Sequence, residues 1–345
     1  MSTGIVDTFE SLIWTDRYCG FGDFELYTVV SDDMMSLLQT DRYLWFKDSE
    51  YVMIIEDVRI TSDVENGNRL TVSGRSLESI LERRIVWTQT ILSGNFQNGI
   101  KKLLDENIIS PTDTTRQISN FIFEESIDTE ITSLTVDCQF YGDNLYDTIC
   151  SLCESNNIGF KITLNDNDQF VFKLYYGADR SYDQIVNPYV VFSPNFDNLR
   201  NTNYLESTTS LKTVSLVAGE GEGSAQKTTT AVSPDGAGEG LTRREMYTDA
   251  SSVSSTTESG TLSNAQYLAQ LEQKGSEDLA ANVETISFDG QIESTNMYVY
   301  GQDYFMGDII QMQNEYGIEA KVRVVELIRS QSVDSIELYP TFTTI

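Results

Sequence analysis

One segment near the middle of the chain changes its apolar period within a few residues, and it constrains the fold more than any other stretch. Between Leu145 and Cys153 the apolar residues recur at helical spacing, after a candidate helix N-cap at Asp143. From Phe160 to Leu174 they alternate with polar residues instead, in two runs separated by turn-forming residues. The segment therefore predicts a helix followed by a β-hairpin with one buried face.

The same patterns divide the rest of the chain into three regions. Residues 1–90 contain short β-rich runs and a closing helix capped by Ser76, which is typical of a small antiparallel barrel. Residues 91–190 contain two amphipathic helices and several strands, which indicate an α+β unit. Residues 191–345 return to strands. We therefore predict a β-rich α+β protein in which two small antiparallel β-barrel-like domains flank an α+β insert.

The C-terminal region also contains polar stretches and one helix. Residues 219–240 and 251–260 are rich in Gly, Ser and Thr and are predicted to be flexible loops, because they cannot bury enough apolar surface. Ser263 and Gln266 fit a capping box that opens a helix over 263–282. The strands expected after it cover 284–292, 297–300, 307–313, 320–328 and 335–339.

Several segments carry a resemblance that covers the chain from about residue 7 to its end. They are Trp14, Arg17, Tyr18 and 22–26; 74–77 with Leu81, Arg83 and Arg84; the helix and hairpin over 145–174, followed by 177–181; 217–223; Arg244, Glu245, Tyr247 and Asp249; and 307–310. In this order they resemble the baseplate-hub proteins of long-tailed bacteriophages, the siphovirus relatives of the contractile-phage hub. No single segment is diagnostic, and the resemblance rests on their order.

The resemblance implies a structural virion protein at the distal end of the phage tail. In that family three copies form a ring, and each copy contributes two similar barrels. The partners implied are the distal tail protein or tail tube protein, the tape-measure protein, and tip, spike or receptor-binding proteins. The chain ends at Ile345, directly after the last predicted strands, so we expect any hydrolase or adhesin to be a separate partner.

Charge limits the partners further. The chain has 53 acidic and 23 basic residues, a net charge of −30, and a field of that sign repels nucleic acid and anionic membranes. We therefore expect genomic DNA only in transit, through an acidic channel, and no membrane partner. The first residues contain Asp7 and Glu10 and no basic run before an apolar one, so no signal peptide is expected.

The absence of histidine removes Ser-His-Asp and Cys-His catalysis and every His-based metal site. Carboxylate chemistry remains, so the alternatives are an Asp/Glu-dependent glycan hydrolase of the tail and a carbohydrate-binding adhesin. With 53 carboxylates the sequence nominates no catalytic pair. We therefore predict no enzymatic activity, no catalytic residue, and no bound cofactor or metal.

Three motifs favour structural readings. Cys150 and Cys153 form a C-x-x-C pair, but Cys153 lies on the apolar helix face, where it behaves as a small hydrophobe; a zinc or redox site is disfavoured. The glycine-rich run 219–223 lacks the features of a phosphate-binding loop and is predicted to be a turn. Residues 165–168 lack the spacing of a calcium loop and are predicted to be a hairpin turn.

Two groups of residues are candidates for contact with other molecules. The first is the aromatic set Trp14, Tyr18, Phe21 and Phe24, for which burial in the core is favoured over a sugar-stacking platform. The second is Arg83 and Arg84, which either reach carboxylates on a neighbouring subunit or pair within their own helix. These two arginines are the candidate interface residues.

Overall fold

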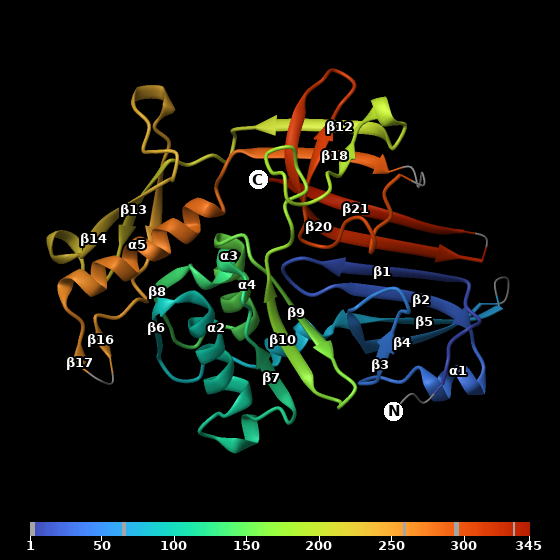
Figure 1. The fold of residues 1–345 in the computed structure, drawn as a ribbon. Helices are drawn as coiled ribbons and strands as arrows, with labels where there is room; N and C mark the ends of the chain where they lie inside the picture. The colour runs from blue at the N-terminus through green and yellow to red at the C-terminus, as the bar shows by residue number, and fades with distance from the viewer. Residues whose placement is uncertain (1–3, 64–66, 258–259, 293–296, 334) are drawn as a thin grey trace.

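The computed structural model describes residues 4–63, 67–257, 260–292, 297–333 and 335–345. It confirms a β-rich α+β protein whose longest helix has 17 residues (Figure 1). No helix in the described ranges is long and apolar enough to cross a membrane.

The largest element is an open nine-stranded sheet built from both ends of the chain. Its order is β11 (Val191–Phe192), β19 (Ile309–Gln313), β20 (Glu319–Ser332), β1 (Ser11–Arg17), β2 (Asp23–Val29), β5 (Gly67–Ser76), β4 (Val52–Asp63) and β3 (Tyr43–Trp45), with β21 (Ile336–Thr344) paired to β20. Figure 1 shows the N-terminal strands in blue lying alongside the C-terminal strands in red. The described strands form no closed barrel.

Strand β20 joins the N-terminal strands of this sheet to the C-terminal ones. One of its edges pairs with β19 and then with β1, from Arg17 opposite Glu326 to Ser11 opposite Ser332. Its other edge pairs with β21. The two strand-rich regions that the sequence separates are therefore hydrogen-bonded to each other through β1 and β20.

In the N-terminal part of the sheet, alternation produces one buried face. Leu12, Trp14, Phe24 and Leu26 point to the same side and form a core beneath residues 4–9 and helix α1 (Asp32–Leu37). After β5 the chain enters a 3₁₀-helix, Leu77–Arg83, where the sequence predicted a short closing helix. Ser76 stands at its N-cap but makes no capping hydrogen bond.

The middle region holds the largest core. Strands β6 (Thr90–Asn95) and β8 (Thr135–Phe140) form one pair, and β7 (Phe121–Glu124), β10 (Phe170–Tyr175) and β9 (Gly159–Leu164) form a small sheet. Helices α2 (Phe96–Leu104), α3 (Thr129–Thr132) and α4 (Leu145–Ser155) accompany these strands. The predicted helix and hairpin are therefore confirmed.

The predicted N-cap of α4 is wrong by one residue. Asn144, not Asp143, has the extended backbone of a cap, and its side chain accepts hydrogen bonds from the backbone N–H groups of Tyr146 and Asp147. Asp143 instead accepts a hydrogen bond from the backbone of Tyr141. Both residue types cap helices, so spacing alone did not distinguish them.

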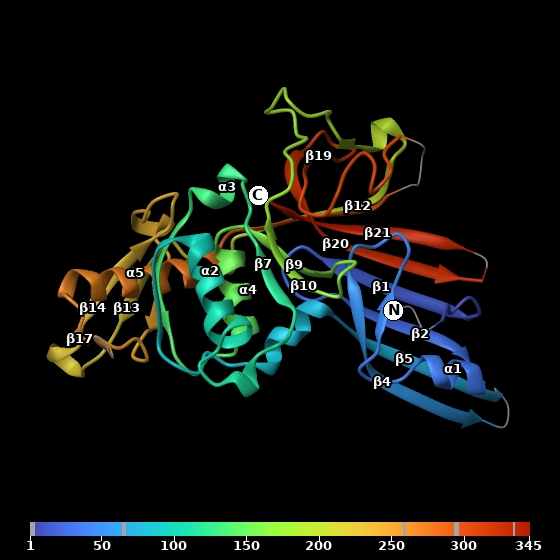
Figure 2. The same ribbon diagram turned by 60° about the horizontal axis from the view of Figure 1, so that its bottom comes forward.

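A smaller layer lies at the far end of the molecule from the nine-stranded sheet (Figure 2). Helix α5 (Asn264–Ala280) packs on the sheet of β13 (Val214–Ala218), β14 (Thr228–Val232) and β15 (Glu245–Asp249). The capping box of Ser263 and Gln266 is confirmed. Strand β14 falls inside the predicted loop 219–240, so that part of the prediction is wrong.

Two further C-terminal details are settled by the strand pairing. Strands β12 (Leu199–Ser207) and β18 (Thr285–Ile292) form a separate antiparallel pair. The strand predicted over 297–300 is wrong, because only an isolated bridge between Tyr300 and Tyr304 forms there. The second predicted loop, 251–260, contains the short strand β16 (Thr256–Thr257) and part of β17 (Gly260–Thr261), with residues 258 and 259 outside the described ranges.

Buried charges lie where the regions meet. Asp16 on β1 and Arg329 on β20 form an ion pair in which both side chains are almost completely buried. The Glu78 carboxylate is also fully buried; it accepts a hydrogen bond from the Ser76 hydroxyl and one of 2.5 Å from the Ile162 backbone N–H on β9. Burial raises the pKa of Glu78 to about 7.

Candidate interaction surface

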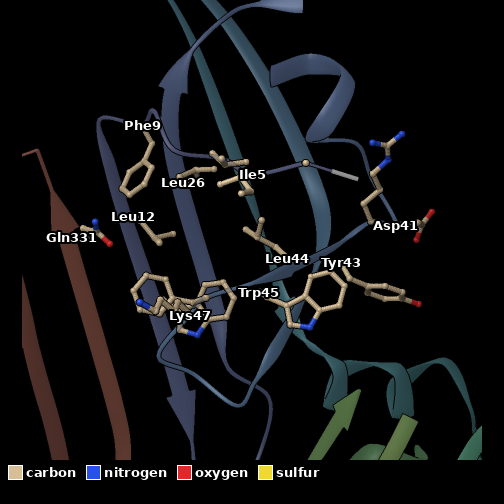
Figure 3. A pocket seen from close by; sticks show the side chains of 15 residues that line it. Ile5, Phe9, Leu12, Leu26, Asp41, Tyr43, Leu44, Trp45, Lys47 and Gln331 are labelled. Atoms are coloured by element: carbon tan, nitrogen blue, oxygen red, sulfur yellow. The ribbon is translucent and has the colours of Figure 1, made fainter. Parts of the chain in front are cut away.

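The chain forms an aromatic hollow beside strand β3 at the end of the nine-stranded sheet. Its volume is about 660 Å³, and its walls include Ile5, Phe9, Leu12, Leu44 and Trp45 (Figure 3). In Figure 3, Tyr43 and Trp45 stand on one side of the hollow, and Phe9, Leu12 and Gln331 stand on the other. Gln331 belongs to β20, so both ends of the chain line the hollow.

Strand β3 presents large aromatic side chains at an edge of the sheet. Within the described strands it pairs only with β4, so its other backbone edge has no strand partner. The Trp45 side chain is 51% exposed and its ring centroid lies 6.4 Å from that of Tyr43. Tyr43 in turn contacts Phe170 of β10 at 6.0 Å, which anchors this edge to the middle region. An edge strand that carries exposed Trp and Tyr is the kind of surface that protein partners cover.

The predicted interface residues Arg83 and Arg84 lie next to this edge. Arg83 is exposed, and its guanidinium lies 4.0 Å from the Asp41 carboxylate, a weak contact at the rim of the hollow. Arg84 is half-buried and donates hydrogen bonds of 2.9 Å to two backbone carbonyls, those of Arg83 and Arg116. Among the described residues neither arginine forms an ion pair with a carboxylate of its own helix, although Arg84 bonds the Arg83 carbonyl at the end of that helix; the interface role of both stays a prediction.

Arg84 lies beside a third arginine that the sequence reading missed. Arg116 donates to the Ile85 carbonyl at 2.8 Å, and its guanidinium stacks 5.2 Å from the ring centroid of Trp87, which is 61% exposed. Neither Arg84 nor Arg116 makes an ion pair with a residue in the described part of the chain. Burial lowers the pKa of Arg116, and the nearby positive charge of Arg84 lowers it further, whereas the Asp113 carboxylate raises it.

These residues line two neighbouring hollows, which are connected by the contact between Arg83 and Asp41. We call Tyr43, Trp45, Arg83, Arg84, Trp87 and Arg116 the aromatic-arginine surface. Arg83, Arg84, Trp87 and Arg116 line a second hollow of about 350 Å³, together with the carboxylates of Glu82 and Asp113. The Arg84 and Arg116 guanidinium groups form no ion pair within the described residues, and beside the exposed Trp87 ring they can bind a carboxylate group with charge-assisted hydrogen bonds.

The predicted aromatic cluster belongs to the interior. Trp14, Tyr18 and Phe24 are 4% exposed or less, and Phe21 packs against Tyr146 with ring centroids 4.9 Å apart. The core reading is therefore confirmed for Trp14, Tyr18 and Phe24, whereas Phe21 is partly buried, and the exposed aromatic residues of this region are Tyr43 and Trp45 instead. Their sequence signal was the β-rich run 43–46, in which three of the four residues are aromatic.

The other motifs have structural roles. Cys153 is fully buried, and burial raises the pKa of its thiol well above the usual value, whereas reactive thiols have lowered values. Residues 219–223 lead from β13 into a 3₁₀ turn before β14. Residues 165–168 form the turn between β9 and β10, where the Asn165 side chain accepts hydrogen bonds from the backbone of Asn167 and Gln169.

A glycosidase would need two carboxyl groups facing one hollow, with a raised pKa on one of them. Asp41 is the one carboxylate among the described residues that line the aromatic hollow. The fully buried carboxyl group with a pKa raised to about 7, Glu78, lies in the core. The arrangement therefore offers binding groups at the surface and no catalytic pair in the aromatic hollow.

Comparisons with known proteins give a consistent result. The family model described as Siphovirus ReqiPepy6 Gp37-like protein matches residues 2–342. No curated protein matches the sequence.

Solved structures with the same fold cover nearly the whole chain. The prophage tail protein gp18 from Listeria monocytogenes EGD-e has a TM-score of 0.55 and 16% identity, over 99% of this chain and 90% of that one. The tail protein from Neisseria meningitidis MC58 has a TM-score of 0.58 and 14% identity, over 98% and 92%. The 43 kDa tail protein of prophage MuSo2 from Shewanella oneidensis has a TM-score of 0.57 and 9% identity, over 99% and 96%.

Proposed function

The chain belongs to the Siphovirus ReqiPepy6 Gp37-like protein family, and from this premise we propose that it is the baseplate or tail-tip hub of a tailed bacteriophage. It is a phage tail protein related to hub and baseplate proteins. In the proposed role it is a non-enzymatic structural component at the distal end of the tail. The observation that supports this role within the structure is the aromatic-arginine surface, an exposed patch suited to permanent assembly.

The proposed assembly is a ring of three copies, and the aromatic-arginine surface contacts a second copy of the chain. The charges support this occupant. Arg84 and Arg116 make no ion pair within the described residues, and a neighbouring copy offers 53 acidic residues spread over its whole length. The surface meets a different surface of the neighbour, and such head-to-tail contacts close into a ring when the rotation between copies is 120°.

In this ring the two strand-rich regions supply the two barrel-like parts of each subunit, joined through β1 and β20. The regions 1–90, 91–190 and 191–345 are proposed as the units of the subunit. One face of the ring meets the distal tail protein or the tail tube protein. The other face meets tip, spike or receptor-binding proteins, and the tape-measure protein ends at the ring.

The oligomeric state tests the proposal. Light scattering on concentrated protein should give the mass of three chains of 38.9 kDa each. Reversing two charges together, Arg84→Glu and Arg116→Glu, should weaken association at least about tenfold, since like charges would then face each other. The matched control is Arg243→Glu, an exposed arginine that pairs with Glu245 in the α5 region.

A monomer in both isolated protein and dissociated virions would overturn the trimer. A trimer that is weakened equally by Arg243→Glu would remove the aromatic-arginine surface from the interface. Quantitative protein counting in purified virions supplies an independent copy number, which should be a multiple of three.

The ring is also proposed to form part of the DNA conduit. An acidic inner wall would let DNA pass without adhesion, because each copy repels phosphate. The isolated protein should therefore show no gel shift with double-stranded DNA at about 0.15 M salt, where charges are screened over roughly 8 Å. Tight, salt-sensitive DNA binding would contradict the passive conduit.

The aromatic hollow supports a second candidate, a carbohydrate-binding adhesin. Trp45 and Tyr43 beside Asp41 offer a stacking face with a polar group at its rim, as sugar-binding sites do. Saturable binding of host glycans that is lost in Trp45→Ala, without turnover of the glycan, would favour this function. Turnover would favour the Asp/Glu-dependent hydrolase.

A further inference from the structure

Three side chains from two regions of the chain meet beside the C-terminal half of helix α4. Cys19 lies in the turn between β1 and β2, Cys150 lies on α4, and Glu154 follows one helical turn later. The two Sγ atoms are 3.8 Å apart, and Cys150 Sγ is 3.7 Å from Glu154 Oε1. The three ligand atoms all lie within 4.8 Å of one another.

The separations of Cys150 Sγ from Cys19 Sγ and from Glu154 Oε1 agree with tetrahedral metal coordination, and the separation of Cys19 Sγ from the Glu154 carboxylate, within 4.8 Å, shortens when an ion binds. Zinc–sulfur bonds of about 2.3 Å at the tetrahedral angle place two thiolates roughly 3.8 Å apart, and a thiolate and a carboxylate oxygen roughly 3.5 Å apart. A disulfide would require the two sulfurs to approach to about 2.0 Å. The observed pair is therefore spaced as two ligands of one ion.

The site is also accessible from solvent. Cys19 and Glu154 line a surface hollow of about 470 Å³, between the middle region and strands β20 and β21. The two arginines in its wall are engaged elsewhere: Arg17 pairs with Asp23 and Glu326, and Arg323 donates to the backbone carbonyl of Gly307. The hollow gives an ion an entry path and leaves room for a water ligand in the fourth position.

We propose that Cys19, Cys150 and Glu154 bind a single thiophilic divalent cation, with Zn²⁺ as the natural choice. The C-x-x-C motif supplies only one ligand, because Cys153 points into the core. The ion would join the β1–β2 turn to α4 across 131 residues of sequence, and so fasten the nine-stranded sheet to the middle region. The proposal concerns the single chain and stands independently of its role in the tail.

Metal titration of the full-length protein tests this site. Protein freed of metal with a chelator and kept reduced should bind one Co²⁺ per chain and develop the thiolate-to-cobalt charge-transfer band. Zn²⁺ should displace the cobalt and raise the melting temperature. Cys19→Ser and Cys150→Ser should each lose at least about 100-fold in Zn²⁺ affinity, since even outer-shell changes cost 10- to 100-fold. Glu154→Gln should lose less.

Two matched controls use the remaining cysteines. Cys153→Ala removes the second cysteine of the motif, and Cys138→Ala removes the buried thiol of β8; both should keep the charge-transfer band and the zinc affinity. Loss of metal in Cys153→Ala would overturn the assignment of Cys19 as the partner of Cys150. Absence of stoichiometric binding in the reduced wild type, or a Cys19–Cys150 disulfide as the only product detected by mass spectrometry, would overturn the site.

Discussion

Replacing the buried carboxylate of Glu78 by an amide should change how the stability of the protein depends on pH. The carboxylate lies at the contact between the nine-stranded sheet and β9, where it accepts hydrogen bonds from Ser76 and Ile162. Its pKa is raised from 4.5 to about 7 by burial. The folded chain therefore holds this proton at pH values where the unfolded chain has released it.

The sign of the effect follows from proton linkage. Between pH 4.5 and 7 the folded state binds more protons than the unfolded state, so stability falls as pH rises. The stabilisation that the proton on Glu78 gives to the folded state is fully present below pH 4.5 and is lost above pH 7. The difference of about 2.5 between the pKa of Glu78 in the folded state and in the unfolded state corresponds to roughly 3 kcal/mol of unfolding free energy. Glu78→Gln has no such proton, and its amide oxygen can still accept from Ile162.

Urea unfolding followed by tryptophan fluorescence at pH 4.5 and pH 8 measures this effect. Subtracting the mutant from the wild type cancels the other titrating groups. The difference should change by about 3 kcal/mol, with the wild type relatively weaker at pH 8. The matched control is Glu82→Gln, a third-exposed carboxylate of the same 3₁₀-helix. Parallel pH profiles for wild type and Glu78→Gln would refute the reasoning, as would an equal effect of Glu82→Gln.

Two further substitutions test contacts between regions of the chain that are distant in sequence. Asp16→Asn leaves Arg329 buried without its counter-charge and should lower the unfolding free energy by about 3–5 kcal/mol in chemical denaturation; a loss below about 1 kcal/mol would contradict a buried pair. Gly159→Ala places a Cβ atom 2.4 Å from the Tyr18 ring and should cost about 1–3 kcal/mol by thermal or urea unfolding. In a double-mutant cycle Tyr18→Leu should relieve part of that cost, and additive effects would locate the strain elsewhere.

The sequence predicted the elements whose causes are local. The helix and hairpin of residues 145–174 follow from a change of apolar period, and the start of α5 follows from the capping box at Ser263. The N-cap of α4 was misplaced by one residue because Asp143 and Asn144 are both good caps. Strand β14 was missed because Thr228–Val232 lies in a polar stretch whose order depends on pairing with β13 and on cover from α5.

Long-range features were beyond the reach of sequence patterns. Pairing of β1 with β20 depends on a register that no single strand specifies, so the two ends of the chain were read as separate barrels. Arg83 and Arg84 were singled out as a charged pair, but Arg116 and Trp87 join them only through the folded backbone. Cys19 is a further example. It lies 131 positions before Cys150 in the sequence, and only the folded chain brings the two sulfur atoms to 3.8 Å.

The pairing of β1 with β20 also has a consequence for synthesis on the ribosome. Ser11 leaves the ribosome more than 300 residues before its partner Ser332, so β1 waits with one open edge until nearly the whole chain has been made. Closing so long a loop is entropically costly, which makes this pairing a late and slow step. A tail protein built in this way cannot present its finished sheet before translation ends. Pulse-labelled nascent chains should therefore stay protease-sensitive at β1 until β20 emerges, and early protection of β1 would contradict this order.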